Sequence, residues 1–201
     1  MSELLLIKNI EFLDKCYPGF KKLVEERKEK LLTEEKLEVL EHTTVNGEVI
    51  LSVRTEERHL WLAGKRRPSA AAENQINLLG KIVPNAPVFV IGMGNMEYLR
   101  ELWRVADTSI ITFVYEPSFS IFYKQMELVD LEKLLGNRLM VLVVKGINDV
   151  ELKSAISTVL VPNRVPLMKH FVLPNYETLF LKEIYISYVY YYFKTIYRFF
   201  F

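Results

Sequence analysis

Short runs of uninterrupted apolar residues alternate with longer amphipathic segments through the middle of the chain, and this alternation constrains the fold most strongly. Each run has the length and character of a strand that is buried on both faces. The runs are PVFVIG at 87–92, IITFVYE at 110–116, LMVLVV at 139–144 and the weaker MKHFVL at 168–173, which contains a lysine and a histidine. Helical segments are expected at about 70–82, 95–106, 118–135 and 147–160. Alternating strands and helices predict an α/β chain with parallel strands and right-handed crossovers.

The N-terminal part of the sequence is expected to be helical. Apolar residues recur at helical spacing through residues 3–41, with a break at Tyr17-Pro18-Gly19. The pattern changes after His42, where Asn46-Gly47 signals a hairpin turn. The β-rich run EVILSVR at 48–54 follows that turn and is expected to contribute the first strand of the sheet.

These features together predict a Rossmann-like α/β fold with an open, mainly parallel sheet of about five to seven strands. An α-helical N-terminal extension and a C-terminal aromatic helix complete the prediction. The central strands are expected at 88–92, 111–115 and 139–144. The expected divisions are the helical extension at 1–41, the Rossmann-like domain at 42–177 and the aromatic helix at 178–201.

The C-terminal stretch is unusually rich in aromatic residues. Its longest uncharged run, from Ile184 to Phe193, lies between Glu183 and Lys194 and is much shorter than the ~20 residues that a bilayer requires. We therefore expect no membrane span. A helix that is apolar on nearly every face needs a cover, so we expect residues 178–201 to pack against a downstream domain or to mediate self-association.

Composition excludes several classes of protein. Half of the residues are hydrophobic, and 26 Lys+Arg stand against 25 Asp+Glu, so neither a disordered chain nor a nucleic-acid binder driven by global charge is expected. The single cysteine, Cys16, excludes an intramolecular disulfide framework and a Cys-rich zinc module. The N-terminus lacks the pattern of a secretory signal, which favours a cytoplasmic location.

The strongest local feature is a strand that leads into Gly92-x-Gly94 and then into a helix, with Asn95 directly after the second glycine. Such a turn lets a ligand approach the backbone at the carboxyl ends of parallel strands, and Glu116 at the end of the next strand is placed to accept ribose hydroxyls. Gly92, Gly94, Asn95 and Glu116 are therefore candidate ligand-binding residues. The alternative is that the glycines only permit a tight turn from strand to helix.

Glu97 stands where the third glycine of a dinucleotide-binding fingerprint would be. A carboxylate in the first turn of a helix competes with a phosphate for the same backbone amides. A pyrophosphate-bearing cofactor is therefore disfavoured. S-adenosylmethionine carries no phosphate and fits this turn better.

A second polar cluster follows the run at 48–54 and includes Arg54 and Arg58, which are candidates for binding a phosphate or a carboxylate. The alternative is a solvated loop. The sequence contains no phosphate-binding loop, no G-x-S-x-G nucleophile elbow and no H-E-x-x-H zinc helix. Catalytic residues, metal ligands and a cofactor are therefore not expected.

Several segments resemble the N-terminal region of the motility accessory factor (Maf) proteins, a family of flagellin glycosyltransferases grouped with hydroxymethylpterin-diphosphokinase-like domains of unknown function. The resemblance covers about residues 40–185. Its most specific pieces are the glycine turn followed by Tyr98 and the VYEPS strand end with Phe119 and Phe122 after it.

In that family the sugar-transfer domain follows this region and opens with a Gly-x-Gly-Pro-Ser loop, which these 201 residues lack. The resemblance therefore implies a bacterial, non-catalytic N-terminal domain that acts in acceptor recognition or domain packing. Its expected partners are the downstream glycosyltransferase domain and flagellin or another acceptor protein. A methyltransferase that uses Gly92, Gly94 and Glu116 is the alternative, and a pterin or nucleotide phosphate transferase is the third hypothesis.

Overall fold

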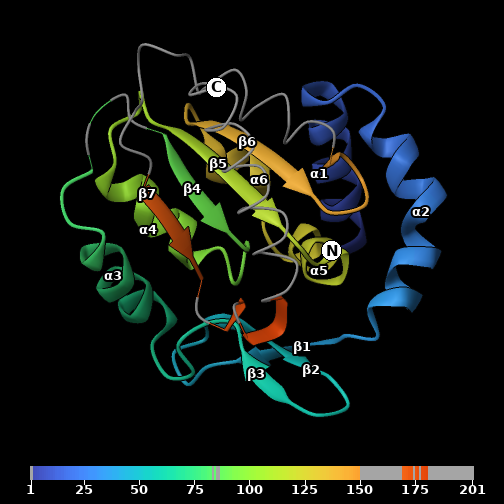
Figure 1. Cartoon of the computed structure of the whole chain (residues 1–201), viewed down its shortest axis with the longest axis horizontal. Coiled ribbons are helices and arrows are strands. Elements are labelled where there is room, and N and C mark those ends of the chain that lie inside the picture. Colours follow the sequence, from blue (N-terminus) through green and yellow to red (C-terminus); the bar gives the residue numbers. More distant parts are fainter. Residues whose placement is uncertain are drawn as a thin grey trace, which may run out of the picture.

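The computed structural model describes residues 2–82, 84, 87–149, 169–173, 175–176 and 178–180, and these form a mixed α/β arrangement with two sheets (Figure 1). The parallel sheet has the order β6-β5-β4-β7. Its strands are β4 (Val88–Ile91), β5 (Ile111–Glu116), β6 (Leu139–Val144) and β7 (Lys169–Val172). The antiparallel sheet has the order β1-β2-β3, with β1 (Glu38–Thr43), β2 (Val49–Arg54) and β3 (His59–Trp61).

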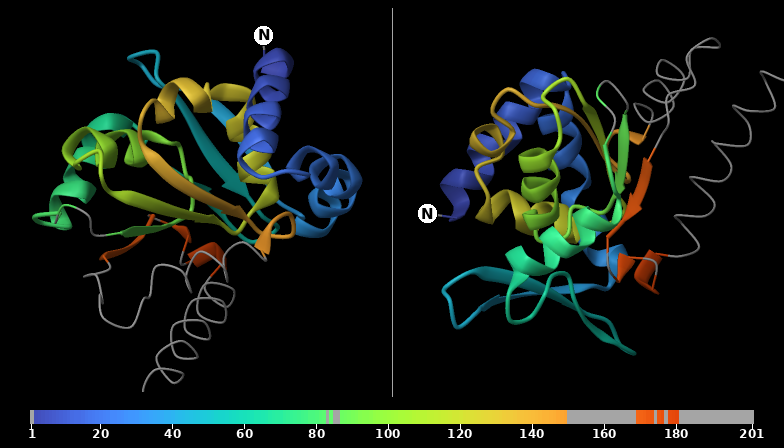
Figure 2. Two further views of the ribbon diagram at one scale, coloured as in Figure 1. Left: turned by 90° about the horizontal axis from the view of Figure 1, so that it is seen from above. Right: turned by 90° about the vertical axis from the view of Figure 1, so that its left-hand side faces the viewer.

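Six helices lie within the described residues. They are α1 (Ser2–Cys16), α2 (Phe20–Glu35), α3 (Pro68–Leu78), α4 (Glu97–Val105), α5 (Phe119–Leu128) and α6 (Leu131–Leu135). Three of them, α4, α5 and α6, cover the same face of the parallel sheet (Figure 2). None of the helices in this part of the chain is long and apolar enough to cross a bilayer.

The four apolar runs expected to form parallel strands do so. All four residues of β4 are buried, which is what a continuous apolar run indicates. Phe89 of β4 and Phe113 of β5 are register partners, and their rings stack with centroids 4.8 Å apart. The expectation that 139–144 is a central strand is not met among the four described strands, because this run forms β6 at one end of their order, while β4 and β5 lie inside.

The run at 48–54 does not join the parallel sheet, which corrects the expectation that it forms the first strand. It forms β2, the middle strand of the antiparallel sheet. Asn46-Gly47 does make the hairpin turn, with Gly47 N–H donating to the Thr44 carbonyl at 2.9 Å. The antiparallel sheet lies at the carboxyl ends of the parallel strands (Figure 1), so the hairpin covers the edge at which open α/β sheets hold ligands.

The helical N-terminal segment ends earlier than its apolar spacing predicts. Helix α2 stops at Glu35 because Lys36 adopts a left-handed conformation with φ of 47°, and β1 begins at Glu38. Neither glycine nor proline marks this boundary. Val39 and Leu40 continue the apolar pattern of the helix and so conceal the change to a strand.

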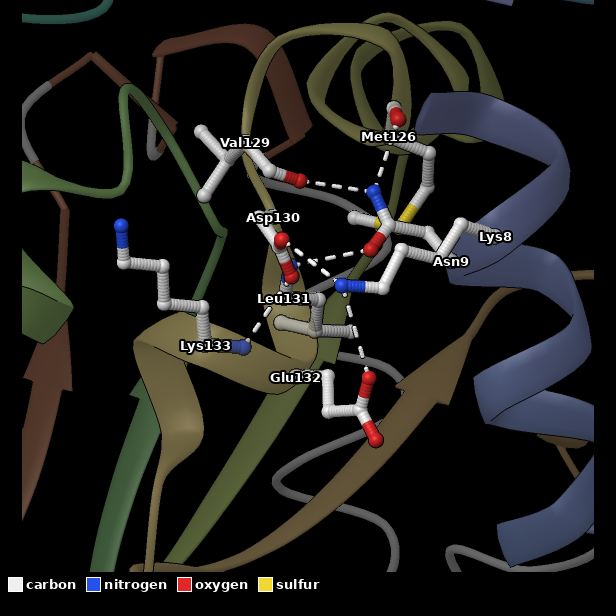
Figure 3. Close-up of polar contacts among 8 residues, drawn as sticks. All are labelled: Lys8, Asn9, Met126, Val129, Asp130, Leu131, Glu132 and Lys133. Atoms are coloured by element: carbon white, nitrogen blue, oxygen red, sulfur yellow. Dashed lines mark hydrogen bonds and ion pairs between the residues drawn. The ribbon is translucent and has the colours of Figure 1, made fainter. Parts of the chain in front are cut away.

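The segment 118–135, expected as one helix, is interrupted between α5 and α6, and buried Asn9 of α1 lies against the break (Figure 3). Its Nδ2 donates to the carbonyls of Met126 at 2.8 Å and Val129 at 2.6 Å, and its Oδ1 accepts from Leu131 N–H at 2.9 Å. Asp130 caps α6 by accepting from the Lys133 N–H at 3.1 Å. Three backbone groups that lack helical partners are thus satisfied by one amide.

Two further expectations fall largely outside the described residues. The helix expected at 147–160 is described only up to residue 149, and the aromatic helix expected at 178–201 only up to residue 180.

Candidate functional site

The chain reverses tightly between β4 and α4, at the turn from Gly92 to Met96. The backbone is left-handed at Gly92 (φ 91°), Gly94 (φ 54°) and Met96 (φ 64°). Glycine adopts this region without steric cost, so the path of the chain accounts for both glycines. The turn lies at the carboxyl end of β4 next to β5, and Gly92 N–H donates to the Tyr115 carbonyl at 2.7 Å.

Glu116, the last residue of β5, is fully buried beside this turn. Its Oε2 accepts from Met93 N–H at 2.6 Å and from the Tyr176 hydroxyl at 2.8 Å. Its Oε1 accepts from Ser118 N–H at 2.9 Å. The carboxyl group that was expected to accept ribose hydroxyls therefore does reach the glycine turn. Three donors of the protein itself, from Met93, Ser118 and Tyr176, already bind it.

Tyr176 occupies the space directly against the glycine turn. Its ring lies so close to Gly92 that a Cβ at that position would be 2.5 Å from it. Its hydroxyl accepts from Gly94 N–H at 3.0 Å while donating to Glu116, and the side chain is fully buried. In a nucleoside site the glycines let a ligand approach the backbone; here Gly92 lets the phenol ring of Tyr176 approach it, and a Cβ at Gly94 would lie 2.7 Å from the side chain of Leu173.

Burial raises the pKa of Glu116 to about 8, and the hydrogen bonds from Met93, Ser118 and Tyr176 oppose part of that increase. Burial also raises the pKa of Tyr176 well above its ordinary value, and the neighbouring Glu116 charge adds to the increase. A charge in this cluster is therefore costly. The phenol stays protonated and acts as a hydrogen-bond donor to Glu116.

Asn95 is buried and connects the turn to the antiparallel sheet. Its Oδ1 accepts from Leu51 N–H at 2.9 Å, and its Nδ2 donates to the Val49 carbonyl at 2.9 Å. On the other side of the turn, Gln125 Nε2 donates to the Gly94 carbonyl at 2.6 Å. Asn95, a candidate for ligand binding, thus fixes the position of β2 by its side chain.

Glu97 is the first residue of α4. Its expected place in the first turn of a helix is confirmed. Its carboxylate pairs with Arg100 at 2.6 Å. Burial raises the pKa of Glu97, and Arg100 opposes this increase.

The two candidate arginines lie at the exposed end of the β2–β3 hairpin. Arg54 is exposed at the end of β2 and pairs with Glu38 at 3.2 Å. Arg58 is exposed in the turn between β2 and β3, and its backbone N–H donates to Thr55 Oγ1 at 3.1 Å. Arg58 also lines an open cleft of about 390 Å³ together with Glu35 and Leu179.

Two residues that contribute to this region, Glu35 and Tyr176, were not predicted from the sequence. Glu35, at the end of α2, accepts from the Ser118 hydroxyl at 2.7 Å and from Ser120 N–H at 3.0 Å, which places its carboxylate on the N-terminus of α5. Tyr176 lies 60 positions after Glu116. Both contacts join distant parts of the chain, and no local pattern signals either of them.

Similarity to a known protein is found at the level of structure only. No protein-family model and no curated protein sequence matches the chain. A solved structure that is similar is the MAf glycosyltransferase from Magnetospirillum magneticum AMB-1, with a TM-score of 0.53 and 18% sequence identity. The match covers 94% of this chain and 35% of that one, so the chain spans about a third of that protein's length. The chain has a Maf-like fold at low sequence identity.

Proposed function

We propose that this chain is a non-catalytic, Rossmann-like domain of a Maf-like protein glycosyltransferase. The observation that carries the proposal is the position of Tyr176, whose ring lies against Gly92 and whose hydroxyl accepts from Gly94 N–H. The similarity of fold to a glycosyltransferase extends over nearly the whole chain. A domain of such a protein whose own ligand turn is filled serves to recognise the acceptor or to hold other domains in place.

The partners in this proposal are a downstream glycosyltransferase domain and a flagellin-like or other surface acceptor protein. Residues 42–177 would form the Rossmann-like domain, and the aromatic residues of 178–201 would be covered by the downstream domain or by a second copy of the chain. The exposed charges around Arg54 and Arg58 belong to the surface available for these contacts.

The methyltransferase alternative requires an open glycine turn and an unoccupied Glu116 carboxylate. Tyr176 meets neither condition, because its hydroxyl accepts from Gly94 N–H and donates to Glu116 at the same time. S-adenosylmethionine would have to displace a fully buried phenol ring and replace both hydrogen bonds. This alternative is therefore the weaker of the two.

The test compares the chain with the longest open reading frame that contains it in the source gene. Both products are purified, and sugar transfer from nucleotide sugars and methyl transfer from S-adenosylmethionine are measured. We expect no turnover of either kind by residues 1–201 and sugar transfer by the longer product. Methyl transfer or sugar transfer by residues 1–201 alone would contradict the proposal, as would a reading frame that encodes nothing further.

A further inference from the structure

Two histidines and a serine meet on the antiparallel sheet, on the face turned away from the core. His42 of β1 and His59 of β3 each lie diagonally across from Ser52 of β2. His42 Nε2 is 2.7 Å from Ser52 Oγ, and His59 Nε2 is 2.8 Å from the same atom. The alternate residues Leu51 and Val53 point the other way and belong to the hydrophobic core.

The shared hydroxyl directs both imidazoles at one point. A hydroxyl carries a single proton, so Ser52 can donate to only one ring nitrogen and must accept from the other. Ser52 is fully buried, His42 is partly buried and His59 is exposed. The Nε2 atoms of His42 and His59 thus converge on one oxygen atom, and the exposed His59 borders the solvent. Two imidazole nitrogens that point at one place can bind the same cation.

Two positive charges lie near the cluster, and both belong to exposed side chains: Arg54, the register partner of His59, pairs with Glu38 at 3.2 Å, and Lys65 lies over Trp61. The indole of Trp61 packs against His42 with ring centroids 4.5 Å apart. The Lys65 ammonium lies 4.9 Å above the Trp61 ring. Lys65 is exposed, and its long flexible stem lets the charge move into solvent when a cation binds.

We propose that His42, His59 and Ser52 form a site for a divalent transition-metal ion, with water completing the coordination. Imidazole nitrogen is a preferred ligand of Cu²⁺, Ni²⁺ and Zn²⁺, and the general order of affinity places Cu²⁺ above Zn²⁺. With metal–ligand bonds of about 2.0–2.2 Å, nitrogen and oxygen ligands of one ion lie farther apart than the present 2.7–2.8 Å, so both rings rotate away from Ser52 Oγ when the ion enters.

Few ligands are available, which makes this a weak and selective site. In the part of the chain that the structure describes, no group of three or more His, Cys, Asp or Glu side chains could hold a metal ion. With two imidazoles and a hydroxyl, affinity depends strongly on the intrinsic preference of the metal for nitrogen. The proposal is independent of the glycosyltransferase assignment, because it uses none of the residues at the glycine turn.

Calorimetric titration of the whole chain with CuSO₄ and ZnSO₄ tests the site. We expect one Cu²⁺ per chain and weaker Zn²⁺ binding. His42→Asn and His59→Asn should each weaken Cu²⁺ binding by more than the about 10–100-fold that loss of an outer-shell partner costs. The matched control is His170→Asn, which removes the third histidine of the chain and should leave Cu²⁺ binding unchanged. Circular dichroism of each variant shows whether it is folded.

A second measurement keeps both histidines in place. Trp103 is buried and donates to Thr112 Oγ1 at 2.9 Å, so Trp103→Phe leaves Trp61 as the sole indole of the chain, which has two tryptophans. Cu²⁺ held by His42 would quench Trp61 fluorescence because the paramagnetic ion lies next to the indole, and Zn²⁺ would not. The proposal is overturned by an absence of saturable quenching, by undiminished Cu²⁺ binding in a folded H42N/H59N variant, or by loss of binding in a folded H170N variant.

Discussion

Replacing Glu116 with glutamine should change how the stability of the protein depends on pH. The folded-state pKa of Glu116 is about 8 because of burial, against 4.5 for an unperturbed glutamate. The folded protein therefore binds this proton more tightly than the unfolded chain does. Between these two values the unfolded chain has lost the proton while the folded protein retains it, so the free energy of unfolding falls as the pH rises.

The size of the effect follows from the two pKa values. Each pKa unit corresponds to about 1.4 kcal/mol, and integration from pH 5 to pH 8 gives a loss of about 3 to 4 kcal/mol for Glu116. This is a large share of the ~5–15 kcal/mol that stabilises a typical domain. Glu116→Gln keeps the shape of the neutral side chain and removes the titration.

Urea denaturation of the wild type and of Glu116→Gln at pH 5 and pH 8 measures this effect. We expect the difference in unfolding free energy, variant minus wild type, to increase by about 3 to 4 kcal/mol from pH 5 to pH 8. The matched control is Glu25→Gln, which removes a carboxyl group from the exposed surface of α2. A difference for Glu116→Gln that is constant, or that decreases with pH, would show that the three hydrogen-bond donors keep Glu116 charged despite its burial.

Three other substitutions or truncations test separate parts of the structure. Gly92→Ala should be far more destabilising than Gly47→Ala in urea denaturation, because both positions have positive φ but only the Cβ at Gly92 would meet the ring of Tyr176, at 2.5 Å; equal losses would argue against the packing of Tyr176. Asn9→Leu should lower the unfolding free energy by about 3 kcal/mol or more, since it leaves three backbone groups without their partner, and a loss below ~1 kcal/mol would contradict that role. Deletion of 184–201 should reduce self-association in light scattering without unfolding the sheet, and an uncut chain that is already monomeric would refute this.

The local chemistry of the sequence predicted the parallel strands but not the antiparallel sheet. Strands buried on both faces read as continuous apolar runs, which is why β4 and β5 were correctly located. β1 was hidden because Lys36 ends the preceding helix without a glycine or proline. β3, a strand of three residues (His59–Trp61), lies in a stretch that reads as a charged loop.

The candidate site was predicted in part. Gly92, Gly94 and Glu116 do come together, as expected from a strand end next to a glycine turn. The sequence could not predict what fills the turn, because Tyr176 is one of 11 tyrosines and nothing in its neighbourhood distinguishes it. Pairing between residues so far apart is set by the tertiary fold, which local patterns do not record.

The most direct test of the claim that Tyr176 closes the glycine turn is isothermal titration of the wild-type chain with S-adenosylhomocysteine and with a nucleoside diphosphate sugar. We expect no saturable heat with either ligand up to about 1 mM, since the Gly94 amide and the Glu116 carboxylate are already bound to Tyr176. Micromolar binding of either ligand that Gly94→Val abolishes in a folded variant would show that the turn is open, and would contradict the claim.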